Sequence, residues 1–245
     1  ILLWRGLLQW IGGVGIIVMA ISILPVLQVG GMQVFRTESS DTTEKILPRT
    51  AQVSFAVIII YLSLTVLCFI SYWLSGMRLF ESLVHSMTTI ATGGFSTRND
   101  SFASFNNRST EYIAILFMIL SSLPILIYLE VTRNGIKSFF RDTQIKTFLI
   151  IIFVSSLLVI SYLWIFDLKN FEQSLRHGAF NVVSIITGTG YTSDNYNLWG
   201  PFPIYLLFFG MFVGGCAGST TCGIKVFRFQ ILFETLKMQL QKLLH

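Results

Sequence analysis

The chain alternates long apolar segments with short polar connections. Five of these segments are long, and they occupy residues 7–29, 53–74, 112–129, 147–166 and 202–232. Their lengths approach or exceed the ~20 residues that an α-helix needs to cross a bilayer. The stretch GGCAGSTTCG at 214–223 interrupts the last segment. The pattern therefore predicts five membrane-crossing helices, of which the last is broken.

Two shorter apolar segments, at 80–91 and 174–187, lie between the long ones. They are too short to cross a bilayer and too apolar to be ordinary loops, and segments of this length are typical of re-entrant helices. Each of the two ends in a glycine-rich turn. Pro25 and Pro124 lie inside long segments, where proline predicts a kink or a helix end.

An internal repeat explains this layout. The segment SLVHSMTTIATGGFST (82–97) aligns without gaps on GAFNVVSIITGTGYTS (178–193), at an offset of 96 residues. Upstream, IIIY at 58–61 matches IIIF at 150–153, at an offset of 92 residues. The repeated unit is a span, a short helix, a glycine-rich turn and a second span.

The repeat predicts three parts of the chain. We expect residues 1–50 to hold the closing span of a first unit and a linker on the cytoplasmic side. Residues 51–145 would form a complete second unit, and residues 146–245 a third unit whose closing span is broken. The expected fold is an all-α membrane protein.

Composition supports this class. Hydrophobic residues make up 53% of the chain and charged residues 12%, whereas soluble domains carry about 25% charged residues. The net charge of +5 does not indicate nucleic-acid binding, because Lys and Arg in membrane proteins mainly set the orientation. If both short helices re-enter from one side, eleven Lys and Arg lie on the opposite loops and five on the re-entrant side. The glycine-rich turns are therefore predicted on the outer side.

The two glycine-rich turns are candidates for an ion filter. Non-helical backbone is tolerated inside a bilayer only where it is buried in protein or lines water. Carbonyl oxygens of such backbone can replace the hydration shell of a monovalent cation, and each short helix aims the negative end of its dipole at the same place. The candidate ligands are the backbone atoms of Ala91, Thr92, Gly93, Gly94 and Phe95 and of Thr187, Gly188, Thr189, Gly190 and Tyr191.

The turn TGTGYT is similar to the potassium-channel filter TVGYG, and ATGGFST is a looser variant of it. We expect Gly94 and Gly190 to permit a carbonyl orientation that a side chain hinders. We expect Phe95 and Tyr191 to point away from the ion path and to wedge each turn against the pore helix.

Close packing of helices is the alternative reading of these glycines, since small residues let membrane helices approach each other. We adopt that reading for IGGVG at 11–15. The two turns differ, because they follow half-length helices and lead into the polar loops RNDSFASFNNRS and SDNYNLWG.

Polar residues around the turns have two readings each. His85 and Asn181 align in the repeat, and they are either hydrogen-bonding supports behind the filters or ordinary packing residues. Asp100 and Asp194 follow the turns, where they either concentrate cations at the mouth or are solvated loop charges.

The sequence resembles the Trk/Ktr/HKT superfamily of cation transporters, and within it the bacterial potassium-uptake subunits. The motifs that carry this resemblance are LLQWIGGVGIIV, GGMQVFRTESSD, LPRT, TTIATGGFSTRNDS, VSIITGTGYTSDNY and GGCAGSTTCGIKV, in that order along the whole chain. The resemblance implies four linked copies of a potassium-channel subunit around one pseudo-fourfold pore. The first filter and most of the fourth copy would lie outside this chain.

The resemblance also implies a gate, an intramembrane loop below the filter at 214–223. Its candidate residues are Gly214, Gly215, Gly218, Ser219, Thr220 and Gly223. Glycines and small polar residues lower the barrier to a backbone rearrangement. Cys222 departs from the glycine expected there, which leaves the detailed motion of this loop open.

The function implied is potassium uptake across the bacterial inner membrane by a multi-pass protein. Potassium, bound at the filter residues only, would be the transported ligand, with no further cofactor and no nucleic acid. The resemblance further implies a homodimer and a cytosolic nucleotide-binding regulatory subunit, similar to TrkA, which the basic inner loops could contact.

The same residues bear on several other functions. A sodium-permeable or sodium- or proton-coupled transporter of the same superfamily stays open, because one glycine per turn gives a shorter filter than TVGYG. The stretch GSTTCGIK nearly spells a phosphate-binding loop, but Ile224 separates Gly223 from Lys225 and no Ser or Thr follows the lysine. No Ser/His/Asp set or carboxylate pair indicates an enzyme. A structural scaffold would not need filter-like turns in a repeat.

Overall fold

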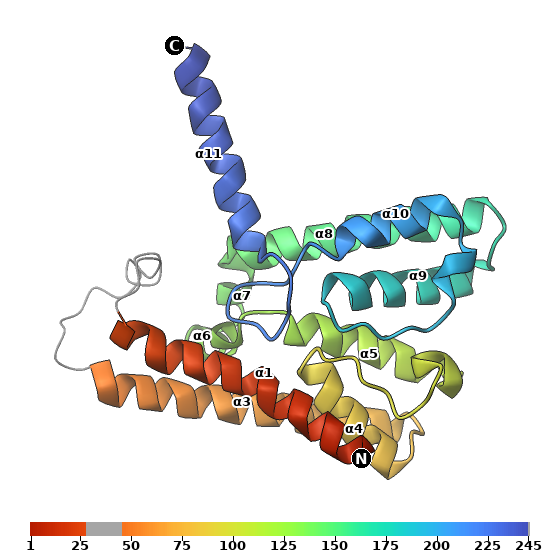
Figure 1. Ribbon diagram of the computed structural model, residues 1–245, viewed down its shortest axis with the longest axis horizontal. Helices are drawn as coiled ribbons and strands as arrows, with labels where there is room; N and C mark the ends of the chain where they lie inside the picture. Colours follow the sequence, from red (N-terminus) through yellow and green to blue (C-terminus); the bar gives the residue numbers. More distant parts are fainter. Residues whose placement is uncertain (28–45, 245) are drawn as a thin grey trace.

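The computed structural model describes residues 1–27 and 46–244, and within these ranges the regular elements are helices (Figure 1). The predicted linker at 28–45 lies outside the described residues. The elements are α1 (Leu2–Leu27), α3 (Ile46–Leu74), α4 (Leu79–Ile90), η2 (Ser101–Phe105), α5 (Arg108–Ser121), α6 (Ile125–Asn134), α7 (Lys137–Arg141), α8 (Thr143–Ile165), α9 (Phe171–Ile186), η3 (Tyr196–Leu198), α10 (Pro201–Gly210) and α11 (Val226–Leu244).

Three of the described helices are long and apolar enough to cross a membrane. They are the segments Leu2–Met19 of α1, Gln52–Leu74 of α3 and Thr143–Ile165 of α8. Large apolar side chains on these helices face outward, and Phe55 and Phe153 are 65% and 68% exposed. Side chains of this kind are stable at a surface that lipid covers, so the predicted spans at 53–74 and 147–166 are confirmed as membrane-type helices.

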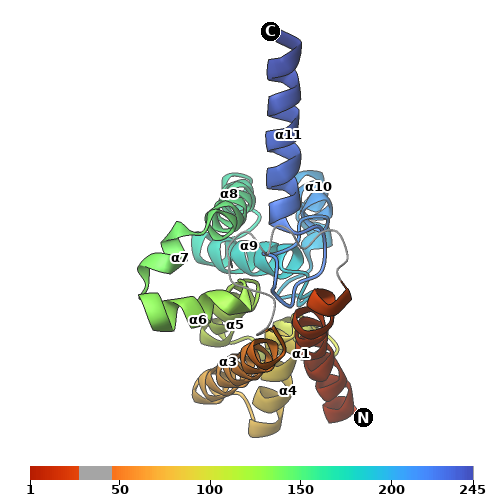
Figure 2. The ribbon, with the colours of Figure 1, turned by 90° about the vertical axis from the view of Figure 1, so that its left-hand side faces the viewer.

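The two short helices α4 and α9 occupy equivalent places in the repeat. Helix α4 packs against α1 and α3, and α9 packs against α8 and α5. Each ends where its glycine-rich turn begins, at Ile90 and Ile186. Figure 2 shows α3, α4 and α1 on one side of the molecule and α8, α9 and α10 on the other, with the turns between them.

The apolar segment at 112–129 forms two helices instead of one. Helix α5 ends at Ser121, α6 begins at Ile125, and the two helices meet at 87°. Pro124 precedes the first residue of α6 and has no N–H with which to continue α5. The predicted kink or helix end at Pro124 is therefore confirmed, and it is sharp enough to separate two helices.

The last apolar segment is also divided. Helix α10 ends at Gly210, the loop 211–225 follows, and α11 begins at Val226. Helix α11 does not continue the direction of α10 but projects from the body of the molecule, as both views show (Figures 1 and 2). The two halves of the segment 202–232 therefore do not share one direction, because α11 leaves the helix bundle.

An aromatic cluster joins the second unit to the third. The buried ring of Phe102, on η2, lies 4.5 Å from the ring of Tyr191, 5.3 Å from Phe180 and 5.4 Å from His85, measured between centroids. The backbone N–H of Ala103 donates to the carbonyl of Thr192 at 3.1 Å. The loop after the first turn is therefore packed against the second turn, which fixes the two units relative to each other.

Candidate ion filter and gate loop

The two glycine-rich turns meet in space. A Cβ atom added to Gly94 would lie 1.7 Å from the carbonyl oxygen of Thr189 and 2.8 Å from its carbonyl carbon. Only glycine allows this approach, since real Cβ atoms keep more than 3 Å from such atoms. The predicted ligand stretches 91–95 and 187–191, which lie about 96 residues apart in sequence, are thus brought into direct contact.

Both turns have the same backbone conformation. The φ angle is positive at Thr92 (49°) and Gly94 (70°), and at the aligned residues Gly188 (71°) and Gly190 (84°). In an ordinary strand successive carbonyls point to opposite sides. Alternating left- and right-handed residues cancels this reversal, so successive carbonyl oxygens can face the same side. Such a row of oxygens is what a dehydrated cation requires.

Hydroxyl groups on the pore helices hold the end of each turn. Thr88 Oγ1 on α4 donates to the carbonyl of Phe95 at 2.9 Å, and Ser184 Oγ on α9 donates to the carbonyl of Tyr191 at 2.6 Å. Sequence reasoning missed Thr88 and Ser184, although they align at the repeat offset of 96 residues. Their hydrogen bonds engage one lone pair of the last candidate carbonyl in each turn and fix where the turn ends.

The side chain of Tyr191 packs against α4, which is the short helix of the neighbouring unit and not of its own. Its buried hydroxyl lies 2.5 Å from Thr88 Oγ1 and 3.3 Å from Thr89 Oγ1, and it donates to the carbonyl of His85 at 3.3 Å, all on α4. Phe95 makes a different contact, because the guanidinium carbon of Arg5 lies over its ring, 4.0 Å from the ring centroid. The third unit's turn is therefore braced by the second unit's pore helix.

Polar supports lie behind both turns, as predicted. His85 Nε2 lies 3.0 Å from Ser96 Oγ, and Asn181 Nδ2 donates to Ser193 Oγ at 3.1 Å. His177 Nδ1 also lies 3.0 Å from Ser193 Oγ. In each unit a serine just after the turn is thus hydrogen-bonded to the pore helix.

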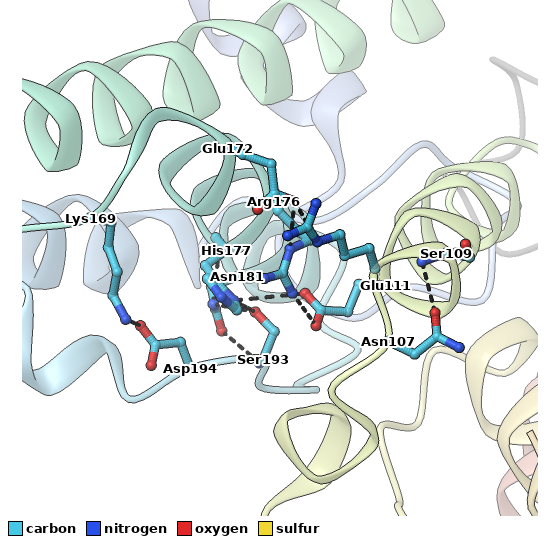
Figure 3. A network of polar contacts seen from close by, with 11 residues as sticks. Asn107, Ser109, Glu111, Lys169, Glu172, Arg176, His177, Asn181, Ser193 and Asp194 are labelled. Carbon is cyan, nitrogen blue, oxygen red and sulfur yellow. Dashed lines mark hydrogen bonds and ion pairs between the residues drawn. The ribbon is translucent and has the colours of Figure 1, made fainter.

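A buried ion pair links α5 to α9 beside these supports (Figure 3). Arg176 Nη1 donates to Glu111 Oε1 at 2.5 Å, and both side chains are almost fully buried. Arg176 Nε donates to Glu172 Oε1 at 3.1 Å. Sequence reasoning missed the Glu111–Arg176 pair because the partners lie 65 residues apart on different units.

The contacts of Asp194 argue against the reading in which it concentrates cations at the mouth. Lys169 Nζ lies 2.8 Å from Asp194 Oδ2 (Figure 3), and Trp199 Nε1 donates to the same oxygen at 2.9 Å. Partial burial alone would raise the pKa of this carboxyl, but the hydrogen bonds from Lys169 and Trp199 outweigh it and hold the pKa below its usual value. The charge of Asp194 is neutralised locally, whereas Asp100 is exposed.

The loop 214–223 lies against the beginning of both turns. Thr220 Oγ1 donates to the carbonyl of Ile90 at 3.1 Å and lies 3.3 Å from Thr92 Oγ1. Cys222 lies beside Gly188, where an added Cβ would come within 2.3 Å of the Cys222 sulfur. One loop therefore touches the helix-proximal end of each candidate filter turn.

The glycines of this loop are required by its own folding. The N–H of Gly214 donates to the carbonyl of Ile224 at 2.9 Å, which closes the loop at its base. A Cβ on Gly214 would lie 2.2 Å from the carbonyl oxygen of Cys222, and Gly218 and Gly223 have φ of 75° and 80°. Thr221 Oγ1 accepts from the N–H of Gly215 at 3.0 Å.

Ser219 and Lys225 complete this internal network. Ser219 Oγ lies 2.8 Å from Thr221 Oγ1 and donates to the carbonyl of Cys216 at 2.6 Å. Lys225 Nζ donates to both oxygens of Thr221. Within the described residues no group of three or more His, Cys, Asp and Glu could hold a metal ion.

The comparisons with known proteins agree along the whole chain. Residues 1–245 match the family TrkH, described as a cation transport protein. The chain is 42% identical over 247 residues to the Trk system potassium uptake protein TrkI of Halomonas elongata, covering 99% of the chain and 49% of that protein. It is 36% identical over 249 residues to the Trk system potassium uptake protein TrkH of Escherichia coli, covering 100% of the chain and 52% of that protein.

The structure matches the crystal structure of the potassium transporter TrkH from Vibrio parahaemolyticus with a TM-score of 0.88 and 34% sequence identity. The match covers 100% of this chain and 50% of that structure, so the chain spans about half the length of its relatives. The fold is therefore the all-α, potassium-channel-like fold of these transporters, which are transport proteins and not enzymes. The chain belongs to the TrkH family of cation transport proteins.

Proposed function

We propose that the complete protein takes up potassium across the bacterial inner membrane through a filter of backbone carbonyls. The observation that carries this proposal is the contact between the two turns, with Gly94 against Thr189 and positive φ at the same two positions of each turn. The backbone atoms of 91–95 and 187–191 are the ligands in this proposal.

The expected chemistry is passive permeation. A potassium ion loses its hydration shell at modest cost when carbonyl oxygens replace the water oxygens at similar positions. The C-terminal ends of α4 and α9 lie next to the turns, and their partial negative charge favours a cation there. No proton-transferring group is needed for this step.

The loop 214–223 is the proposed gate. It contacts Thr92 through Thr220 and Gly188 through Cys222, so it occupies the position from which it can obstruct an ion that leaves the turns. Its small residues, among them Gly214, Gly215, Gly218, Ser219, Thr220 and Gly223, allow it to change its backbone conformation without displacing large side chains.

The partners remain part of the proposal. We infer a homodimer and a cytosolic nucleotide-binding regulatory subunit similar to TrkA. Exposed basic side chains on and beside α7, among them Lys137 and Arg141, give this subunit a positively charged surface to contact.

A sodium-permeable or sodium- or proton-coupled transporter is the second candidate. The carbonyls of Phe95 and Tyr191 accept hydrogen bonds from Thr88 and Ser184, and the carbonyl of Gly93 accepts one from Gln9 Nε2 at 2.9 Å. Few carbonyls in the turns are therefore left without a protein donor. A shorter run of ligands is expected to discriminate less strictly between potassium and sodium.

Growth at low potassium tests the proposal. The complete protein, expressed in a bacterium that lacks its own potassium uptake systems, is expected to restore growth at limiting potassium and to mediate rubidium uptake. Uptake that requires sodium would favour the coupled alternative. Failure of growth and of rubidium uptake, with the protein present in the membrane, would contradict the proposal.

A further inference from the structure

The break between α5 and α6 removes hydrogen bonds that a continuous helix would make. In an unbroken helix the N–H of residue 125 would donate to the carbonyl of Ser121, and the N–H of residue 126 to that of Ser122. Pro124 has no N–H to donate to Leu120. Each unpaired backbone group inside a membrane protein costs several kcal/mol, so these groups need other partners.

One of these partners comes from the broken span itself. The carbonyl of Leu120, which Pro124 cannot serve, accepts a hydrogen bond from the hydroxyl of Tyr128 on α6 at 2.6 Å. It also accepts from the N–H of Leu123 at 3.2 Å. The carbonyl that Pro124 leaves without its helical donor therefore finds donors within the same span.

The loop 214–223 supplies partners for the carbonyls of Ser121 and Ser122 and for the N–H of Ile125. Three hydrogen bonds join the two segments, and they run from Thr220 Oγ1 to the carbonyl of Ser121 (3.2 Å), from the N–H of Cys216 to the carbonyl of Ser122 (3.1 Å) and from the N–H of Ile125 to the carbonyl of Gly218 (3.0 Å). The loop thus supplies the bonds that the bend removes from the helix.

We propose that the α5–α6 break and the gate loop form one two-state element. In one state the span is bent and the loop is docked on it. In the other state the loop is released, and Ser121 and Ser122 recover their helical partners as the span straightens. The carbonyls of Ser121 and Ser122 and the N–H of Ile125 have a partner in both states, either in the loop or in the straight helix. This inference rests on the proposed function of the loop as a gate.

This two-state element would couple movement of α6 and α7 to the contact between the loop and the filter turn. Thr220 bonds both to Ser121 at the break and to Ile90 at the end of α4, so undocking the loop from the break also removes it from the filter turn. Helix α6 continues from the break into α7, whose Lys137 and Arg141 are exposed. A partner that moves α6 and α7 would act on the gate through this bend.

Pro124→Ala tests the two-state element at the break. Alanine restores the N–H toward Leu120 and favours the straight span, so the loop is released more often. A gain of one hydrogen bond corresponds to ~1 kcal/mol, and hence to an increase of about fivefold in the released population. The matched control is Pro201→Ala, because Pro201 begins α10 without breaking a helix.

Cys216 is a native reporter of loop release. Its side chain is fully buried when the loop is docked. Labelling by a membrane-permeant maleimide in the complete protein, quantified at the Cys216 peptide by mass spectrometry, is expected to become about fivefold faster in Pro124→Ala. An unchanged rate, equal to that of Pro201→Ala, would overturn the inference. This readout does not require transport, so it separates a failure of the inference from a failure of the proposed function.

Thr220→Val tests the other side of the contact. It removes the hydroxyl that bonds to the break, and it is expected to raise both Cys216 labelling and basal rubidium uptake several-fold. Thr132→Val is the matched control, because Thr132 lies on α6, is exposed and bonds only within its own helix. If Cys216 is labelled in Thr220→Val at the same rate as in Thr132→Val, the inference is contradicted. This test holds even if Pro124→Ala does not reach the membrane.

Discussion

The backbone conformation of the two turns restricts which residues can occupy particular positions. Gly94 and Gly190 both have positive φ, but their surroundings differ. A side chain at Gly94 would collide with the carbonyl of Thr189, whereas the space beside Gly190 is open within 4 Å. Gly94 is therefore constrained by conformation and by contact, and Gly190 by conformation alone.

This difference predicts the order of two substitutions. Gly190→Ala introduces a left-handed alanine at a cost of ~1–2 kcal/mol and should lower discrimination against sodium. Gly94→Ala carries the same cost and also pushes the two turns apart, so it should reduce rubidium uptake and selectivity more strongly. Competition of sodium with rubidium uptake in the complete protein measures both effects. A weaker effect at Gly94 than at Gly190 would contradict the contact between the turns.

The contact of Lys169 with Asp194 predicts a pH dependence. The pKa of Asp194 is lower in the folded protein than in the unfolded chain, so the pair stabilises the fold above the ordinary carboxyl pKa of about 3.9. This contribution is lost as the pH falls through the folded-state pKa. Asp194→Asn should therefore lower the thermal unfolding midpoint at pH 6, and the difference from the unchanged protein should shrink below about pH 4. A difference that grows on acidification would contradict the assignment.

At the scale of elements, the units are joined by contacts between helices distant in sequence. The buried pair of Glu111 on α5 and Arg176 on α9 is the shortest ion pair across the two units (Figure 3). Removing one partner of a buried pair leaves the other charge without compensation, which is more costly than replacing both.

Glu111→Gln is therefore expected to destabilise the protein by about 2 kcal/mol, less than a fully unpaired buried charge would cost because Arg176 keeps its ion pair with Glu172. A lowered thermal unfolding midpoint in detergent would record this loss. The double variant Glu111→Leu with Arg176→Leu should unfold at a higher temperature than the single one. Glu234→Gln, on the exposed side of α11, is the control and should change little. Equal effects of Glu111→Gln and Glu234→Gln would refute the role of the pair.

Much of the element pattern is predictable from local sequence. Apolar length identifies α3 and α8, and the repeat identifies α4, α9 and their turns, because each of these features is encoded within one segment. Pro124 predicts a break, but its angle of 87° depends on the loop 214–223, which lies about 90 residues further along the chain. The direction of α11 and the pairing of Asp194 with Lys169 likewise depend on tertiary contacts.

At the scale of the whole molecule, the described part holds two interlocked repeat units of a TrkH-family chain. Tyr191 of the third unit packs on α4 of the second, and Phe102 of the second packs between Tyr191 and Phe180 of the third. The repeat predicts that the turns are equivalent, while the interlocking arises from the hydroxyl of Tyr191, which its aligned counterpart Phe95 lacks, and from Phe102, which lies outside the aligned segment. Each turn is thus held by its own pore helix and, in the case of Tyr191, by its neighbour's.

If the turns 91–95 and 187–191 share one ion path, bound cations should lie between them. Crystals of the complete protein grown in rubidium, or soaked with thallium, reveal these cations through anomalous scattering. We expect an anomalous peak between the two turns, in contact with their backbone carbonyl oxygens. A well-ordered structure with no peak between the turns, and with the bound cations elsewhere, would contradict it.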